Sequence, residues 1–483
     1  MQQSSLSTQL LGGYLPHEIP LLLPLELIRR VLQECRCYHQ RYRRLSMEWV
    51  VLVLVFMAVY RELPIDEILR KVMHACAMYL GKDPGDYPKC NAISYRRQQL
   101  SVKAMRELVR EVCQPLAQEN TRGAFFHGLR MVAIDGHVIQ VPDTPKNAHA
   151  FGYHDTGRGR SVYPTVQSVF LCEVGTHALI DGIFLSSRRS EHVGAHKMLD
   201  SIEAGMLVMW DAGLHDYFMV REVLRKGAHV LARVPCDIHF EILERLPDKS
   251  FLAWLYPSSK QRKQLVAKGL IAKGSPRAQE RLLVRLMEYT ITQEGLPGYG
   301  EIHRLLFTLP DPAVCPAHEA AVCYHQRWEM EGALDEVETH QLLGKATLRS
   351  KTPRAVLQEL YGIWLAHYLE RKLIHQAALE ADIDPDRISF TESLRLIQDT
   401  IPAILGEAAL QITSRCCKLS EWIAVRYEWL IGIIKERILP KRRFRSNPRV
   451  VKQRNRTKFR AKKPDDYSPP NLIGSFGDVI ALI

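Results

Sequence analysis

Helical periodicity covers the first quarter of the chain. Apolar residues recur at three- and four-residue spacing in 23–32, 61–80 and 101–116, and Ser101 is suited to cap the last of these segments. The longest apolar run, 49–60, has twelve residues. That is shorter than the ~20 residues that span a bilayer, so we expect a buried core helix or an interior strand there and no membrane association.

A basic, polar stretch (YRRQQ, 95–99) precedes the third helical segment. A small helical region with a basic helix start is typical of DNA-binding domains, but many surface helices show the same pattern. Both interpretations remain open at this stage.

After residue 128 the pattern changes to short apolar runs rich in β-forming residues. The runs and helical segments follow one another as 129–134, 137–141, 163–174, 178–185, helical 191–204, 206–210, helical 217–226 and 229–234. With 129–134 and 137–141 counted as one strand, this order of three strands, helix, strand, helix and strand predicts a mixed α/β sheet whose first three strands form a meander.

Strand-like runs continue at 281–292 and 302–309 after a basic, turn-rich stretch, 258–281, and one long helix is expected at 324–348. Helical periodicity then extends through 352–379 and 390–439. We therefore expect five regions: a helical DNA-binding domain (1–125), the first part of an α/β core (126–234), an inserted β subdomain (235–320), the second part of the core with C-terminal helices (321–440), and a basic flexible tail (441–483).

Positive charge is concentrated in that tail. The chain has 65 Lys and Arg against 53 Asp and Glu, and residues 441–463 contain twelve basic residues and no acidic one. The rest of the chain is therefore balanced, and the tail predicts a polyanionic partner. A solvated, disordered arm is the simpler alternative. With 46% hydrophobic residues the chain is otherwise typical of a globular protein.

Two of the apolar runs end in an aspartate. Asp135 follows MVAI and Asp211 follows MLVMW. Catalytic groups of α/β sheets gather at the carboxyl ends of strands, although an aspartate after a strand more often forms a turn or a helix cap. Turn formation explains the other acids nearby, which are Asp143, Asp155, Asp181 and Asp216.

A third acid is expected on the helix that begins near residue 324. Tyr324, Arg327 and Glu331 are spaced to share one helix face. An exposed face of ion pairs is the simpler explanation, and on the residues alone Glu329 is as good a candidate as Glu331.

Taken together, these motifs resemble the DDE transposases of bacterial insertion sequences, in the cut-and-paste branch with a Y-(2)-R-(3)-E-(6)-K motif, the insertion-sequence-four family. Tyr324, Arg327 and Glu331 match the motif in spacing. Three further segments are similar to the family's sequences: AIDGHVIQVPDTPKNAHAFG around Asp135, MLVMWDAGLHDY around Asp211, and TLRSKTP at 347–353. The resemblance covers roughly residues 20–460. It implies a ribonuclease H-like mixed sheet with an inserted β subdomain, flanked by helical regions.

The resemblance also implies the chemistry. Asp135, Asp211 and Glu331 would be the catalytic acids and would bind two Mg²⁺ ions, with Mn²⁺ as an alternative, for cleavage of DNA at the element's ends and strand transfer into target DNA. Contacts to DNA are expected from Tyr324, Arg327, Lys345, Arg349, Lys351, Arg442, Arg443 and Arg445.

The implied partners are double-stranded DNA, as inverted-repeat ends and as target, and a second copy of the chain in a synaptic homodimer. The N-terminus has no basic segment leading into an apolar core, so we expect no signal peptide and a cytoplasmic protein that associates with the nucleoid through DNA.

One position departs from the family motif. Its final Lys falls at residue 338, where this chain has Glu338, and Lys345 is the candidate to take over its role. This departure favours one alternative, a catalytically impaired DNA-binding protein derived from a transposase. A second alternative is another metal-dependent nuclease or resolvase on the same core that works without strand transfer.

Overall fold

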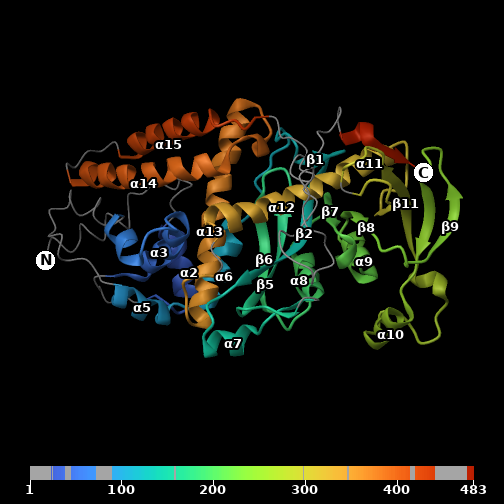
Figure 1. Ribbon diagram of the computed structural model, residues 1–483, viewed down its shortest axis with the longest axis horizontal. Helices are drawn as coiled ribbons and strands as arrows, with labels where there is room; N and C mark the ends of the chain where they lie inside the picture. The colour runs from blue at the N-terminus through green and yellow to red at the C-terminus, as the bar shows by residue number, and fades with distance from the viewer. Residues whose placement is uncertain are drawn as a thin grey trace.

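The computed structural model describes residues 23, 25–38, 45–71, 90–156, 159–296, 298–344, 347–413, 419–440 and 476–482. N-terminal helices lie at one end of the elongated molecule, beside the long helix α13 (Pro353–Ala381), and a sheet fills the middle (Figure 1). At the other end the chain builds strands β9 (Phe240–Arg245) to β12 (His303–Phe307) and helix α10 (Ser259–Ala267).

The N-terminal region is helical, as predicted. Its helices are α2 (Leu25–Glu34), α3 (Met47–Val59), α5 (Cys90–Gln99) and α6 (Val102–Val112), and residues 65–71 are also helical. The hydroxyl of Ser101 accepts a hydrogen bond from the Ala104 amide at 3.0 Å, which confirms the expected cap of α6. The apolar run at 49–60 forms α3 rather than a strand, and every residue of α3 is buried.

Helices α3 and α13 pack against each other at very close range. A Cβ atom at Gly362 would come within 2.6 Å of the carbonyl oxygen of Leu54. Only a glycine at this position of α13 permits such an approach. The buried length of α3 and this contact fix the N-terminal helices to the rest of the chain.

The basic stretch on α5 is internal. Arg96 and Arg97 are both buried, and Arg97 donates to the Ser350 hydroxyl at 3.0 Å and to the Ala355 carbonyl at 2.8 Å. These contacts join α5 to the start of α13. The DNA-contact interpretation is therefore wrong for these two arginines.

The central sheet has the predicted order of elements. Its strands are β2 (Leu129–Gln140), β5 (Thr165–Glu173), β6 (Ala178–Ser186), β7 (Met206–Trp210) and β8 (His229–Arg233). Strands β2, β5 and β6 form an antiparallel meander, and β7 pairs in parallel with both β2 and β8. Helices α8 (Glu191–Met198) and α9 (Tyr217–Arg225) connect the later strands. This is the ribonuclease H-like arrangement.

The inserted strands extend the same sheet. Strand β12 pairs antiparallel with β8, and β11 (Leu282–Ile291), β10 (Phe251–Leu255) and β9 follow in order. The expected subdomain is thus continuous with the core sheet. Helix α10 lies within the basic, turn-rich stretch 258–281, where no helix is predicted from the sequence.

The end of the chain corrects the predicted flexible tail. Strand β13 (Ile480–Leu482) pairs antiparallel with β11, and His318 contacts the Gly477 carbonyl at 2.8 Å. Residues 476–482 are therefore part of the sheet region, whereas the basic segment 441–463 lies outside the described residues.

The long helix expected at 324–348 begins and ends seven residues earlier, at 317 and 341, and changes geometry along its length. It consists of α11 (Ala317–Tyr324), the 3-10 turn η5 (His325–Arg327), α12 (Trp328–Asp335) and the π-helical turn η6 (Glu336–Gln341). After α13 come α14 (Phe390–Thr413) and α15 (Leu419–Lys435). Short elements complete the fold: β1 (Phe125–Phe126), α7 (Pro145–Phe151), β3 (Asp155–Thr156), β4 (Gly159–Arg160), η2 (Leu199–Ser201), η3 (Ala212–Leu214), η4 (Arg277–Glu280), η7 (Pro385–Arg387) and η9 (Phe476–Val479).

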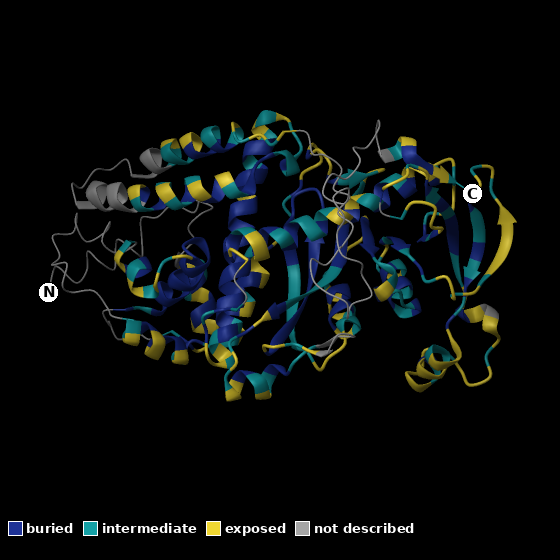
Figure 2. Ribbon diagram, in the orientation of Figure 1, coloured by how far each residue is buried: buried dark blue, intermediate teal, exposed yellow. Residues whose placement is uncertain are grey.

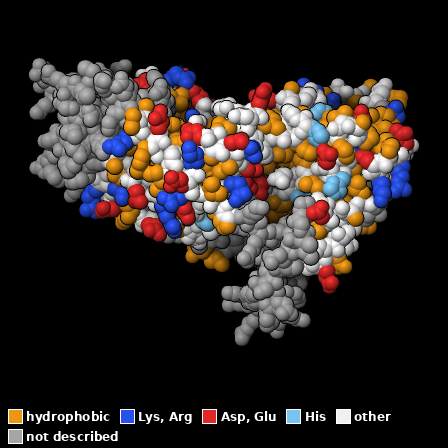
Figure 3. Space-filling view, turned by 90° about the horizontal axis from the view of Figure 1, so that it is seen from above, with side chains coloured by type: hydrophobic (Ala, Val, Ile, Leu, Met, Phe, Trp, Pro, Cys, Tyr) orange, Lys and Arg blue, Asp and Glu red, His pale blue; other side chains and the backbone are white. Residues whose placement is uncertain are grey.

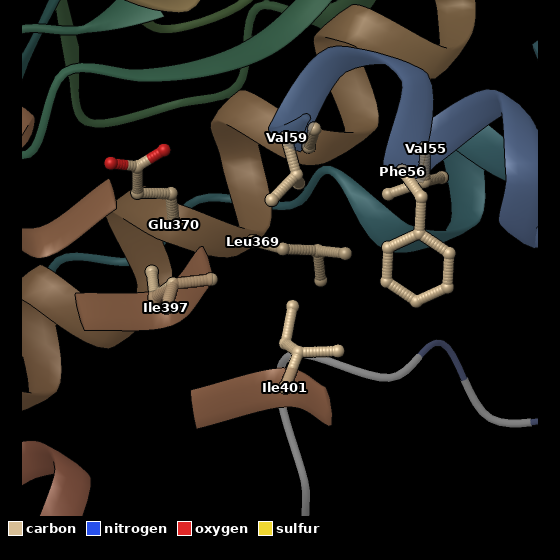
Figure 4. A pocket seen from close by; sticks show the side chains of 8 residues that line it. Val55, Phe56, Val59, Leu369, Glu370, Ile397 and Ile401 are labelled. Carbon is tan, nitrogen blue, oxygen red and sulfur yellow. The ribbon is translucent and has the colours of Figure 1, made fainter. Parts of the chain in front are cut away.

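Burial is highest in α3, α13 and the central strands (Figure 2). An apolar pocket lies where α3, α13 and α14 meet, and the carboxyl group of Glu370 lies at its edge (Figure 4). Burial raises the pKa of Glu370 well above its ordinary value, and Glu336 raises it further. None of the helices in the described ranges is long and apolar enough to cross a bilayer.

Candidate active site

Strand register brings the two aspartates together. Strand β2 pairs in parallel with β7 up to Ala133, which lies opposite Met209. The strand pairing stops there, and two residues further along each segment lie Asp135 and Asp211, which are close enough for Asp211 to raise the pKa of Asp135. The sequence predicted Asp135 at the end of its strand. That prediction is wrong, because β2 continues to Gln140 along β5. The two carboxylates nevertheless emerge where the parallel pairing stops.

The carboxylate of Asp135 is largely enclosed. Its Oδ1 accepts from the Gly136 amide at 2.8 Å, and its Oδ2 accepts from Nη1 of Arg327 at 3.2 Å. Burial and the nearby Asp211 raise the pKa of Asp135, while Arg327, the Gly136 amide and His137 oppose that rise. The effect of burial is the larger one, so the pKa of Asp135 remains raised because the nearby positive charge does not offset the loss of solvation.

Arg327 links two of the three predicted acids. Its Nη2 donates to Oε1 of Glu331 at 3.4 Å while Nη1 contacts Asp135. The guanidinium is also close enough to Asp211 for that carboxylate to raise the pKa of Arg327. Asp135, Asp211 and Glu331 come from three separate segments and meet around this one side chain, which is only 6% exposed.

Tyr324 has an internal contact in this structure. Its ring is 5% exposed, and its hydroxyl donates to the Trp210 carbonyl at 3.4 Å, directly before Asp211. Tyr324 therefore fixes the end of α11 against β7. The adjacent Trp328 is 52% exposed, and the Arg327 guanidinium lies 5.4 Å from the centre of its ring.

The structure distinguishes Glu331 from Glu329. Oε2 of Glu329 lies 2.9 Å from Nε2 of His177, a fully buried residue after β5. Glu331 lies on the other side of the helix, in contact with Arg327. Of the two acids that the residues alone left open, Glu331 is the one that faces Asp135.

A fourth carboxylate, which sequence reasoning missed, lies at the same place. Glu191 is the first residue of α8, and a Cβ atom built on Gly136 would come within 2.0 Å of its Oε1. Burial raises the pKa of Glu191, and Asp135 and Asp211 raise it further. The only local signal was an acidic residue at a helix start, which is common for reasons of the helix dipole.

Asp211 also has the structural role that the simpler interpretation predicted. It is the N-cap of η3, and its Oδ1 accepts from the Leu214 amide at 3.1 Å. Three of the other acids are held elsewhere: Asp143 by Tyr153, Asp181 by Ser201 and Asp216 by His196.

Glu338, at the motif's Lys position, lies in the π-helical turn η6. Its Oε2 is 3.4 Å from Nε2 of His137, two residues after Asp135 on β2. The side chain of Glu338 is 58% exposed. This acid therefore stands at the solvent-exposed rim of the site.

The remaining predicted DNA contacts fall into three groups. Lys351 is exposed, whereas Arg349 is half-buried and donates to the Leu63 carbonyl at 2.6 Å, an internal contact. Lys345, Arg442, Arg443 and Arg445 lie outside the described residues. On the face seen in Figure 3, basic and acidic side chains of the described residues are interspersed.

The donor set fits a hard divalent cation. Carboxylate oxygens are the ligands that Mg²⁺ and Mn²⁺ prefer. The pKa of Asp135 is raised mainly by burial, and the nearby Asp211 adds to the rise. In the part of the chain that the structure describes, no three acidic, His or Cys side chains are close enough to hold one ion. Arg327 lies between Asp135 and Glu331 instead.

Comparison with known proteins identifies the family of this chain. Residues 127–369 match the family model described as "Transposase DDE domain", and residues 17–110 match "Insertion element 4 transposase N-terminal". Among curated proteins, the chain is 28% identical over 432 residues to "Transposase InsG for insertion sequence element IS4" of Escherichia coli (strain K12), covering 89% of this chain and 90% of that one. It is 27% identical over 208 residues to "Putative transposase InsZ" of the same organism, and this match covers 43% of this chain and 67% of that protein.

Among solved structures, a piggyBac transposase in a synaptic complex with hairpin DNA matches over 91% of this chain and 86% of that one. The sequence identity is 11% and the TM-score is 0.39, and the family assignment does not depend on this match.

The mixed sheet and the match to the transposase DDE domain define a ribonuclease H-like DDE enzyme, which cleaves DNA and transfers strands. The chain belongs to the insertion-sequence-four family of DDE transposases. The transposase DDE domain implies dependence on a divalent metal. No finding favours the catalytically impaired alternative.

Proposed function

We propose that Asp135, Asp211 and Glu331 bind the divalent cations of this transposase, and that the cations are a pair of Mg²⁺ ions. The convergence of the three carboxylates on one guanidinium carries the proposal. Bound Mg²⁺ would activate the attacking water and stabilise charge on the leaving oxygen of the phosphodiester.

Arg327 has a separate part in this proposal. Without metal its guanidinium neutralises Asp135 and Glu331, and its Nε atom is buried with no hydrogen-bond partner among the described residues. Cations at the carboxylates would release the guanidinium, which could then bind a DNA phosphate through two parallel hydrogen bonds. Tyr324 would keep the helix in register with β7.

The direct test uses the DNA that flanks this gene. We expect the full chain to cleave the element's ends with Mg²⁺, to release a 3′-hydroxyl and to join it to target DNA. Chelation by EDTA should abolish both steps. Cleavage that persists in EDTA would contradict the metal proposal, and cleavage without joining would contradict strand transfer by this chain.

We further propose that the N-terminal helices (1–125) and the basic segment 441–463 bind DNA, and that two copies of the chain hold the two ends in a synaptic homodimer. In the cell the protein would be cytoplasmic and nucleoid-associated. The twelve basic residues of segment 441–463, with no acidic one among them, support its contribution to binding.

Deleting residues 441–463 should make DNA binding less sensitive to salt. Each neutralised phosphate contributes about −0.9 to the slope of log K against log salt, so loss of several contacts should reduce the slope by several units. Fluorescence anisotropy with end DNA between about 50 and 200 mM salt measures it. The control for length is a variant that keeps segment 441–463 at its full length but has serine in place of its twelve basic residues. Its salt slope should match that of the deletion. An unchanged slope would exclude this segment as a DNA contact.

Replacing Glu338 by lysine should strengthen binding of end DNA. The change replaces a repulsive charge at the rim of the site with an attractive one, and we expect a gain of about two- to tenfold at low salt, falling as salt rises. Glu338→Gln, which only removes the negative charge, should give a smaller gain. If Glu338→Lys binds more weakly than the wild type, the pair that Glu338 forms with His137 is needed for binding.

A further inference from the structure

The structure places a carboxylate beyond the proposed three at the metal site, and we propose that Glu191 is a fourth carboxylate that binds its divalent cations. This inference rests on the function proposed above. It adds a residue from α8 to acids from β2, β7 and α12.

Three observations place the Glu191 carboxylate. Helix α8 packs against β2, which contains Asp135, and against η3, which Asp211 caps. The hydroxyl of Ser190 accepts from the His192 amide at 3.3 Å and so fixes the helix to begin at residue 191. From there the side chain reaches the backbone of Gly136, the residue next to Asp135.

Gly136 is the residue that makes this approach possible. Its backbone is in an ordinary strand conformation, so its lack of a side chain is not required by a turn. A Cβ there would meet Oε1 of Glu191 at 2.0 Å and Nε2 of Gln167 at 2.9 Å. Glycine therefore leaves the space in which the Glu191 carboxylate lies.

Charge balance gives the carboxylate its purpose. Asp135, Asp211, Glu331 and Glu191 bring four negative charges together, and Arg327 offsets one of them. Two divalent cations carry four positive charges and would balance the four acids when Arg327 turns to DNA. The backbone amide of Gly136 opposes the rise in the pKa of Glu191 but does not cancel it.

The test measures metal binding directly, as Mn²⁺ affinity of the full chain by electron paramagnetic resonance. Glu191→Gln should weaken Mn²⁺ binding about tenfold, with an unchanged circular dichroism spectrum. Asp200→Asn, at an exposed acid just after the same helix, is the matched control and should bind Mn²⁺ like the wild type.

Gly136→Ala tests the geometry independently. Its methyl group should displace the flexible end of Glu191 and weaken Mn²⁺ binding to a similar extent, and the double variant should be no weaker than either single one. Fully additive losses would overturn the claim that both changes act through one carboxylate.

Asp135→Asn separates this inference from the proposed function. If Asp135→Asn retains wild-type Mn²⁺ affinity, the metal site itself is misassigned. If Asp135→Asn loses binding while Glu191→Gln keeps it, only the role of Glu191 is overturned.

Discussion

Replacement of Asp135 by asparagine is expected to reduce Mg²⁺-dependent cleavage of end DNA by about a thousandfold or more. Asp211→Asn and Glu331→Gln should have effects of the same order. A bound metal supplies several kcal/mol of charge stabilisation, and about 4 kcal/mol corresponds to a factor of ~10³ in rate. Single-turnover cleavage of labelled end DNA, with Mg²⁺ in excess, measures the loss.

A control acid separates chemistry from folding. Asp143 is an exposed acid in the loop after β2, held by the Tyr153 hydroxyl at 2.8 Å, and Asp143→Asn should cleave within about twofold of the wild type. Each of the three site variants should retain the wild-type circular dichroism spectrum and DNA affinity. Cleavage within tenfold of the wild type would refute the assignment of that residue.

Replacement of Glu336 by glutamine is expected to destabilise the protein by about 3–5 kcal/mol. Glu336 is buried, and its carboxylate contacts Arg371, Nδ1 of His177 at 2.9 Å and Nε2 of His367 at 3.1 Å. Removing its charge leaves the guanidinium of Arg371 buried without its counter-ion. Because this cluster joins η6, α13 and the turn after β5, its loss should also loosen α12, which carries Glu331. Urea denaturation measures the free energy of unfolding.

Acidic pH should reduce the difference in unfolding free energy between the wild type and Glu336→Gln. Burial alone would raise the pKa of Glu336, but Arg371, His177 and His367 hold it well below the ordinary value. A carboxylate with a depressed pKa stabilises the fold above its unfolded-state pKa, and that contribution is lost as the pH falls through the folded-state pKa. The gap between wild type and Glu336→Gln should therefore narrow on acidification below about pH 4.3.

Glu338→Gln is the matched control for Glu336, because it changes an exposed acid in the same π-helical turn. We expect its unfolding free energy to lie within about 0.5 kcal/mol of the wild type. A loss of less than about 1 kcal/mol for Glu336→Gln would show that the buried cluster adds little to stability.

Local sequence patterns were sufficient for the order of elements in the core. The apolar runs at β2, β5, β6, β7 and β8 and the amphipathic segments at α6 and α9 gave the meander and the parallel strands in the right sequence. Where local patterns conflicted with tertiary contacts, they misled. Arg97 looked like a surface charge but is buried because Gln358, Ser350 and Ala355 supply its hydrogen-bond partners.

The candidate site was only partly visible in the chain. Asp135 and Asp211 were marked by abrupt acids after apolar runs, and the family resemblance separated Glu331 from Glu329. In the structure the two acids differ because Glu331 lies on the side of α12 that faces β2, whereas Glu329 lies on the side that faces His177. Which side faces which depends on how α12 packs against strands far away in the sequence. Glu191 had no distinguishing signal, because its role arises from a missing side chain at Gly136, 55 positions earlier.

The sequence by itself determined the class of fold, the identity of the strands and helices, and the candidate acids, because hydrophobic periodicity and the chemistry of side chains are local properties. Only the tertiary structure decided which acids share a site, which arginines are internal, and that the last residues join the sheet through β13. Those outcomes depend on strand register and helix packing between segments far apart in the chain, which no local pattern specifies.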